Sequence, residues 1–288
     1  MKLRRKNYTR LEFIALTGDN YTSHSSTDLQ LLSAPHHDRY SRYQNHAILS
    51  RAQRIVWLLE ELNIPYEIKT FKRKADMTAP DELKKIHPLG KSPVVTITTP
   101  NCAEPLVLAE SAVIIEYLCT HFGGQKLIPQ RYAEGKEGQI GGEADAWMRY
   151  QYFMHYTEGS LAPFLVMKVV IDGVRNAPVP FFIKPVTRMI ASKVEGAFIN
   201  PNIHTHLGFL EERLKTAPGG GPYLCGDKIT AADIQLSYSV IAALSRLASL
   251  RGQYPGVAAY ADRLQAIESY KRGVAQIERI EGTFTASL

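Results

Sequence analysis

Cysteine is scarce in this 288-residue chain, and so are long apolar runs. Cys102, Cys119 and Cys225 lie far apart and form no Cys-x-x-Cys pair. An odd, sparse set disfavours a disulfide framework, favours a reducing compartment and offers no metal-ligand spacing. No apolar run reaches the ~18 residues of a membrane-spanning helix, because Pro163 and Lys168 interrupt the longest apolar patch. We therefore expect a cytoplasmic protein with no transmembrane segment and no metal site.

A strong charge of one sign is also absent. The chain has 34 Lys and Arg against 28 Asp and Glu, a formal net charge of +6. The excess is dispersed apart from one basic cluster near the N-terminus, formed by Lys2, Arg4, Arg5, Lys6 and Arg10. Nucleic-acid binding needs a denser basic patch with stacking aromatics, so we expect no nucleic-acid partner. A mild positive field suits small anionic substrates.

The first 42 residues lack sustained apolar periodicity and are rich in Ser, Thr, Asn, Asp and His. Such a composition is typical of a poorly ordered segment. We therefore expect a poorly ordered N-terminal extension over residues 1–42. Its one apolar island, residues 11–16, has the composition of a strand.

Residues 43–123 are predicted to form a small α/β domain. Apolar residues recur at helical spacing from residue 52 to residue 62, and Pro65 follows the end of that helix. Residues 66–71 alternate between apolar and charged side chains, as a half-buried strand does. The expected elements are a helix over 50–62, a strand over 66–71, a short helix over 80–86, strands over 93–97 and 106–108, and a helix over 111–121.

Residues 130–282 are predicted to form an all-helical domain. The Thr-Ala-Ala-Asp sequence that begins at Thr230 is a capping box, with Ile229 and Ile234 as its hydrophobic staple. A long helix should bend at Pro163. The expected helices cover residues 144–170, 185–194, 204–214, 231–247 and 256–267.

Several short motifs of this sequence resemble glutathione S-transferases, and they occur in the order and at the spacing typical of that family. The first is Ser-Arg-Ala-Gln-Arg-Ile-Val-Trp-Leu-Leu-Glu-Glu-Leu at residues 50–62. The next two are Ile-His-Pro-Leu-Gly-Lys-Ser-Pro-Val at 86–94 and Leu-Ala-Glu-Ser-Ala at 108–112. Gly-Asp-Lys-Ile-Thr-Ala-Ala-Asp at 226–233 is similar to the signature of the family's helical domain. Tyr-Thr-Glu-Gly-Ser-Leu at 156–161 and the insert at 180–194 resemble the yeast-type fungal class.

The resemblance implies a fold and an activity together. The fold is a thioredoxin-like glutathione-binding domain of α/β class followed by an all-α domain. The activity is attack of the glutathione thiolate on a small hydrophobic electrophile, with peroxidase activity by the same thiolate as a further expectation. Roles in detoxification and oxidative stress, and a homodimer, follow from the family. Glutathione enters as co-substrate, and no cofactor is expected.

Ser50 is the candidate catalytic residue, at the start of the first predicted helix. A free thiol has a pKa of about 8.5, which a donor hydrogen bond or a helix N-terminus lowers. The Ser50 hydroxyl can donate to such a thiolate beside the helix dipole. The alternative is a capping box of Ser50 with Gln53, and the resemblance favours catalysis. Arg51 is a second candidate to face the thiolate.

The Ser92–Pro93 pair is the second candidate site. In thioredoxin-like folds the residue before a cis-proline offers its backbone to a bound peptide, as an added strand does. The resemblance implies that Pro93 is cis, and the alternative is an ordinary proline at a strand start. Lys91 is a candidate to pair with the glycine carboxylate of glutathione.

Glu110 and Ser111 form the third candidate site. Ser111 at a helix N-terminus can bind a carboxylate through its amide and hydroxyl. Glu110 can accept the ammonium of the γ-glutamyl group. The alternative for this pair is helix capping. Tyr156, on the long helix, is a candidate for the electrophile pocket, although a core position is the simpler interpretation for it.

The family's first strand is central in the sheet, parallel to the strand after Pro93, and ends a few residues before the helix-opening serine. Here that window is polar until Ala47. Three explanations are open. Residues 43–48 form a poor, short strand; residues 11–16 fill the place through a long loop, which is uncommon; or the segment is a variant start that folds badly. The first and third are preferred.

Two other functions compete with transferase activity. One is a non-catalytic glutathione-binding or regulatory protein on the same scaffold, because fold does not determine function. The other is a cysteine-dependent thiol-transferase, which needs a cysteine where this chain has Ser50. The second is the weaker of the two.

Overall fold

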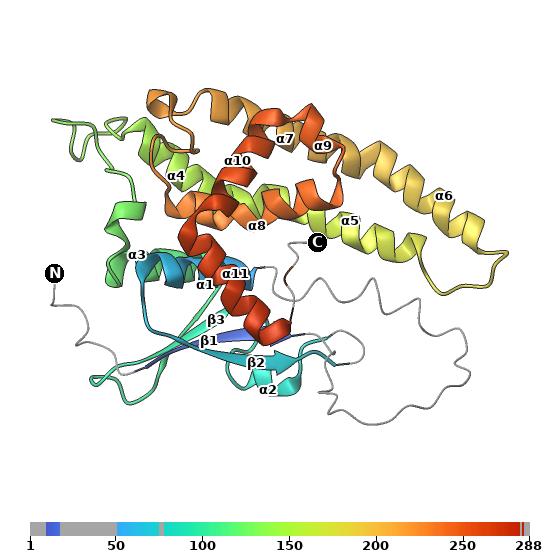
Figure 1. Cartoon of the computed structure of the whole chain (residues 1–288), viewed down its shortest axis with the longest axis horizontal. Helices are drawn as coiled ribbons and strands as arrows, with labels where there is room; N and C mark the ends of the chain where they lie inside the picture. Colours follow the sequence, from blue (N-terminus) through green and yellow to red (C-terminus); the bar gives the residue numbers. More distant parts are fainter. Residues whose placement is uncertain (1–9, 18–50, 75–77, 283, 285–288) are drawn as a thin grey trace.

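The computed structural model describes residues 10–17, 51–74, 78–282 and 284. Within them a four-stranded sheet lies beneath a larger layer of helices (Figure 1). The strand order is β2-β1-β3-β4, with β1 parallel to β2 and antiparallel to β3, and β4 antiparallel to β3. The strands are β1 (Arg10–Thr17), β2 (Glu67–Lys72), β3 (Val94–Thr98) and β4 (Leu106–Ala109). A central first strand is present as expected, but the expectation that it runs parallel to the strand after Pro93 is wrong.

The central strand β1 is the apolar island of the N-terminal region. Leu11 and Phe13 point into the main core, whereas Ile14 and Leu16 pack on the other face of the sheet. A strand buried on both faces needs a nearly continuous apolar run, and the polar window before residue 47 has none. The second explanation for the first strand is therefore correct. The prediction of a poorly ordered extension over residues 1–42 is wrong for Arg10–Thr17, and the window 43–48 lies outside the described residues.

Three helices accompany the sheet. They are α1 (Ala52–Leu62), α2 (Asp81–Lys84) and α3 (Ser111–His121). Every residue of α1 from Ala52 to Leu59 is buried, so this helix lies between the sheet and the helical domain instead of at the surface. It ends at Asn63, whose left-handed backbone (φ 53°) stops the helix before Pro65.

The rest of the chain is helical, as predicted, with two differences. The disturbance expected near Pro163 is a π-helical segment, Thr157–Leu161, because Pro163 cannot donate to the turn before it. A second π-helical segment, Glu195–Ile199, joins α6 to α7 into one rod. The longer helices are α4 (Asp145–Tyr156), α5 (Ala162–Arg175), α6 (Lys184–Val194), α7 (Asn200–Lys215), α8 (Ala231–Arg246), α10 (Pro255–Ala266) and α11 (Glu268–Glu281). The shorter ones are Gly124–Leu127, Pro218–Gly220 and α9 (Leu250–Gln253).

Helix α11 is absent from the predicted helices, which end at residue 267, and it connects the two domains. It packs along α1, where a Cβ added to Gly273 would lie 3.2 Å from the Cα of Trp57. The Trp57 indole donates to Ser269 Oγ at 3.0 Å and meets the Tyr270 ring edge-on at 5.2 Å. One continuous core therefore serves both domains.

The capping box at Thr230 is confirmed. The Thr230 side chain bonds the backbone of the third helical residue, and the Asp233 side chain bonds back to Thr230. The predicted fold class, an α/β domain followed by an all-α domain, is confirmed as well. In the part of the chain that the structure describes, no helix combines the length and hydropathy needed to cross a bilayer.

Candidate functional site

A cavity of about 200 Å³ opens where the start of α1, the turn before β3, the start of α3 and the π-helical segment after α4 meet. It gathers six of the eight predicted site residues. They are Arg51, Lys91, Ser92, Pro93, Glu110 and Ser111. The remaining lining residues are His87, Leu89, Ala109 and Glu158. Segments far apart in the sequence thus meet around one small, polar space.

The Ser92–Pro93 peptide bond is cis, as the resemblance implies. The Ser92 hydroxyl donates to the carbonyl of Ile14 at 3.2 Å, which ties this turn to the central strand. The Ser92 backbone forms no backbone hydrogen bond with another described residue. A backbone without such bonds suits an extended ligand that adds to this turn as a strand does.

Glu110 and Ser111 connect β4 to α3. Glu110 has φ 68° and ψ 122°, a conformation that non-glycine residues rarely adopt and that concentrates at functional sites. Neither residue caps α3 through its side chain, so the capping alternative has no support here. Ser111 is buried, and its hydroxyl lies 3.4 Å from both Arg54 Nη1 and Gln235 Nε2. The first amides of α3, which have no partner within the helix, open next to the cavity.

An ion pair joins the buried Arg54 to Glu158, which lines the cavity, and the sequence analysis missed it. Arg54 is only 1% exposed and donates to Glu158 Oε1 at 2.5 Å and to Ser239 Oγ at 3.0 Å. Arg51 donates to the other Glu158 oxygen at 2.9 Å. Glu158 therefore connects the helical domain to Arg54 of α1 and to Arg51 just before that helix.

The arrangement of this pair favours the charged form of Glu158. Burial alone raises the pKa of Glu158, but the charges and hydrogen bonds of Arg54 and Arg51 outweigh it and keep that pKa below its ordinary value. Burial lowers the pKa of Arg54, although a guanidinium remains protonated. Two features of the sequence could have indicated this pair. Arg54 is a charged residue inside the apolar run of α1, and Glu158 is the only acidic residue in the motif at residues 156–161.

The cavity carries further charges beyond this pair. The Lys91 ammonium and the Glu110 carboxylate form no ion pair with any described residue. A cation, helix amides, a free carboxylate and an exposed backbone turn suit a small ligand with two carboxylates and one ammonium. Within the described ranges, no group of three His, Cys, Asp or Glu side chains is arranged to hold a metal ion.

Two predicted residues lie apart from this set. Ser50 is outside the described residues, and α1 begins at Ala52, just after the cavity-lining Arg51. Tyr156 is 5% exposed and its hydroxyl lies 2.8 Å from His206 Nδ1. Its ring stacks on Tyr152 at 5.5 Å, and burial raises the Tyr156 pKa far above its ordinary value. Tyr156 thus occupies an aromatic part of the core and does not line the cavity.

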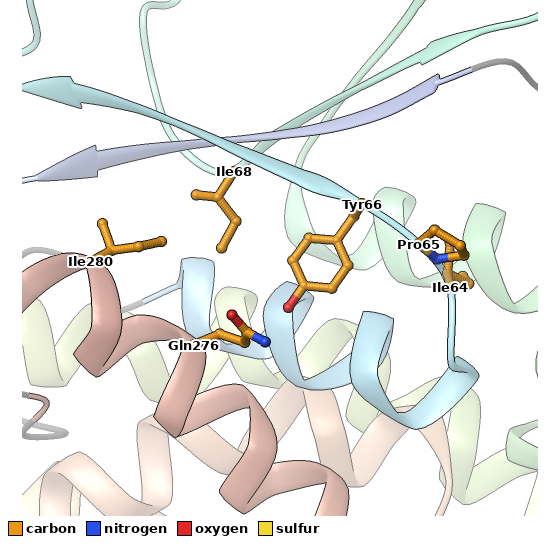
Figure 2. A pocket seen from close by; sticks show the side chains of 6 residues that line it. All are labelled: Ile64, Pro65, Tyr66, Ile68, Gln276 and Ile280. Atoms are coloured by element: carbon orange, nitrogen blue, oxygen red, sulfur yellow. The ribbon is translucent and has the colours of Figure 1, made fainter.

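A second hollow, of about 420 Å³, lies between β2 and α11 (Figure 2). Ile64, Pro65, Ile68 and Ile280 supply apolar groups, and the Tyr66 and Gln276 side chains approach each other across it. The lining includes no charged side chain, and the Tyr66 hydroxyl is bonded to Glu60 at 2.8 Å. It is larger than the first cavity, but its lining offers no cation to a carboxylate.

Comparisons with known proteins identify the family that both parts of the chain resemble. Residues 50–121 match the family model "Glutathione S-transferase, N-terminal domain", and residues 175–272 match "Glutathione S-transferase, C-terminal domain". Glutathione S-transferase 1 of Saccharomyces cerevisiae is 32% identical over 221 residues, 77% of this chain and 88% of the relative. Glutathione S-transferase 3 of Schizosaccharomyces pombe is 32% identical over 200 residues, 69% of this chain and 73% of the relative.

Solved structures show the same fold. A glutathione transferase homolog from Lodderomyces elongisporus, with two GSH per subunit, has a TM-score of 0.60 at 18% identity. That match covers 92% of this chain and 97% of the other. Ure2p in complex with glutathione has a TM-score of 0.59 at 14% identity, over 91% of this chain and 97% of the other.

Proposed function

The chain belongs to the glutathione S-transferase family, and from this premise we propose that it conjugates the thiolate of glutathione to small hydrophobic electrophiles. The observation that carries the proposal is the cavity that unites Arg51, Lys91, the cis-proline turn, Glu110 and Ser111. Each of these groups matches one part of a tripeptide that has two carboxylates, one ammonium and one thiol. No further cofactor is needed for this chemistry.

The γ-glutamyl end of glutathione belongs at the start of α3. Its ammonium pairs with Glu110, and its carboxylate accepts from the amide and hydroxyl of Ser111. The Ser92 backbone pairs with the peptide in the middle, and Lys91 pairs with the glycine carboxylate. Binding at both ends directs the cysteine side chain toward the start of α1, where Arg51 lies.

The chemical step is a nucleophilic attack by sulfur. The thiol first gives its proton to solvent, and the Ser50 hydroxyl and the dipole of α1 stabilise the thiolate. The sulfur electron pair then forms the bond to the electrophilic carbon, and the leaving group departs with its own electron pair. With a hydroperoxide as electrophile, two glutathione molecules are oxidised to the disulfide while the peroxide is reduced to alcohol and water. Roles in detoxification and oxidative stress follow from these reactions.

A cysteine-dependent mechanism is not supported by the described cysteines. Cys119 and Cys225 are buried, and burial raises the pKa of each thiol to about 12. Cys102 is exposed but does not line the cavity. We also propose the homodimer of the family as the working assembly.

The test is conjugation of glutathione to a chlorodinitrobenzene by wild type, Ser50→Ala and the control Ser245→Ala, an exposed serine of α8. We expect kcat/KM to fall at least tenfold in Ser50→Ala, with the control unchanged. Equal turnover in all three proteins would remove Ser50 from the mechanism. If wild type binds glutathione-agarose but turns over no electrophile or peroxide, the non-catalytic alternative is correct.

A further inference from the structure

Helices α5 and α6 form a hairpin that projects from the body of the molecule (Figure 1). We call it the arm, residues 162–194, with its tip at the turn between Arg175 and Lys184. Its base is fixed by ion pairs: Lys168 bonds Asp172 at 2.8 Å and Glu195 at 2.9 Å, and Arg246 of α8 bonds Asp172. The arm is therefore a supported element of the fold.

The arm exposes large apolar side chains. Phe181 and Phe182 at the tip are 83% and 67% exposed, and their rings contact each other at 5.6 Å. Met189 is 63% exposed, and within α6 only Ala191 is buried. The other exposed apolar residues of the arm are Val166, Val170, Val174, Ile183, Val186 and Ile190. Exposed patches of this kind mark interaction sites.

The charge of the arm from residue 173 to residue 194 has one sign. No Asp or Glu occurs from residue 173 to residue 194, whereas four basic residues do. Arg175 is paired with Glu195. Lys184, Arg188 and Lys193 are exposed and form no ion pair with another described residue. Exposed aromatic and aliphatic side chains are thus mixed with unneutralised cations.

We propose that the tip of the arm and the exposed face of α6 dock on the surface of an anionic phospholipid bilayer. Aromatic and aliphatic side chains enter the boundary between head groups and acyl chains, while lysine and arginine meet the anionic head groups. The helices lie on the surface and do not span it.

A second copy of this chain is a poorer occupant of the same face. A two-fold interface packs a patch against its own copy, so it would gather Lys184, Arg188 and Lys193 of both copies, with no Asp or Glu of residues 173–194 to pair with them. Like charges brought together in an apolar interface are unfavourable. The lipid surface supplies the opposite charge and an apolar layer at once.

The arm tip is also remote from the cavity. The 14 residues of α5 separate Glu158 from the turn, about 21 Å at 1.5 Å per residue. Docking at the tip therefore does not depend on glutathione binding, and the arm can be altered without touching the cavity. The inference stands independently of the proposed reaction.

The experiment is co-sedimentation of the full chain with vesicles of phosphatidylcholine alone or mixed with phosphatidylserine. One variant is Lys184→Gln/Arg188→Gln/Lys193→Gln, and its matched control is Lys85→Gln/Lys136→Gln/Lys228→Gln, three exposed lysines outside the arm. A second variant is Phe181→Ser/Phe182→Ser, with Val113→Ser as control. Thermal unfolding and glutathione conjugation show that each variant is folded.

Wild type should bind the anionic vesicles and not the neutral ones, more weakly at high salt. Each cation near an anionic surface strengthens partitioning about fivefold, so the arm triple variant should bind about a hundredfold more weakly. The control triple should stay close to wild type, and the phenylalanine variant should bind at least tenfold more weakly.

Three results would overturn the proposal. They are no binding of wild type to anionic vesicles, equal losses in the arm and control triples, and a wild-type oligomer that Phe181→Ser/Phe182→Ser dissociates without any vesicle binding. The last would assign the arm to a second copy. Binding of wild type to polyglutamate but not to vesicles would assign it to an acidic protein and would also reject the lipid surface.

Discussion

Arg54 of α1 and Asp233 of α8 are both buried charges, but the protein surrounds them in different ways. Asp233 is 0% exposed and accepts four hydrogen bonds. Two come from the amide and hydroxyl of Thr230, at 2.7 Å each. The others come from the Leu224 amide at 3.2 Å and the Tyr260 hydroxyl at 2.8 Å. All four donors belong to the helical domain.

Arg54 is less completely satisfied. Its Nε has no partner among the described residues, and the amide groups of Gln53 and the Gln235 Oε1 are buried without partners as well. Its bond to Ser111 is long, at 3.4 Å. Ser111 and Glu158, which it contacts, both line the cavity.

The different surroundings of Asp233 and Arg54 indicate different roles for the two charges. A buried charge whose partners are all supplied by the fold serves stability. Arg54 instead contacts Ser111 and Glu158, which both line the cavity, so its charge positions two groups that a ligand can reach. Changes at Asp233 should therefore act on folding, and changes around Arg54 should act on folding and on glutathione binding together.

Asp233→Ala should have the largest effect. It removes the acceptor of four buried donors, so we expect the free energy of unfolding to fall by about 3–5 kcal/mol. Urea denaturation measures this loss. Asp227→Ala, an exposed aspartate in the same turn, is the control and should change little. If Asp233→Ala is too unstable to purify, Tyr260→Phe should still lose about 1–2 kcal/mol. A wild-type midpoint in both variants would refute the structural role.

Arg54→Met should cause the next largest loss of stability, and it should also weaken glutathione binding. Glu158 would keep only Arg51, and Ser111 would lose one contact, so we expect about 2–3 kcal/mol less stability and a weaker affinity for glutathione. Calorimetric titration measures the affinity on folded protein. Arg51→Met, which removes the exposed partner of Glu158, should leave stability nearly unchanged.

A double-mutant cycle tests the coupling directly. Arg54→Met/Glu158→Gln should be less destabilised than the sum of its two single variants, because no unpaired buried charge remains. Strictly additive losses would show that Arg54 and Glu158 do not act as a pair.

Six of the eight predicted site residues line one cavity, because most of them lie in short contiguous motifs. Lys91, Ser92 and Pro93 form one turn, and Glu110 and Ser111 form another, so local chemistry and family resemblance place them together. The Arg54–Glu158 pair joins residues 104 positions apart, and no local pattern indicates such a contact.

The position of the first strand was predicted wrongly for a related reason. Residues 18–51 separate β1 from α1, and the expectation of a short loop favoured a strand next to the helix. The burial of residues 11–16 on both faces of the sheet outweighs that expectation, because the central position needs apolar side chains on each side. Helix α11 was missed although Tyr270, Val274 and Ile277 recur at helical spacing between its many charged residues.

Acid titration sharpens the comparison, because Glu158 and Asp233 should respond with opposite signs. The pKa of Glu158 is lowered by folding, so its contribution to stability is present above about pH 4.5 and is lost as pH falls through its folded pKa. Burial raises the pKa of Asp233, against the effect of its hydrogen bonds, so folding favours its protonated form and its contribution grows as pH falls toward about 3.8.

The stability difference between wild type and Glu158→Gln should therefore shrink as pH falls below about 4.5. Denaturant unfolding across acidic pH measures it, with the exposed Glu134→Gln as control. A difference that widens on acidification would contradict the ion pair.

Glu110→Gly should have the smallest effect on folding and the opposite sign. Glu110 has a backbone φ of 68°, which glycine adopts freely, so the variant should gain about 1 kcal/mol of stability. It also loses the carboxylate proposed to hold the γ-glutamyl ammonium, so affinity for glutathione should fall about tenfold. Glu110→Gln separates the two effects, because it removes the charge while keeping the unfavourable backbone. If Glu110→Gly gains stability and retains full affinity, the strained backbone has no binding role, and the ammonium must find its carboxylate at Glu158 instead.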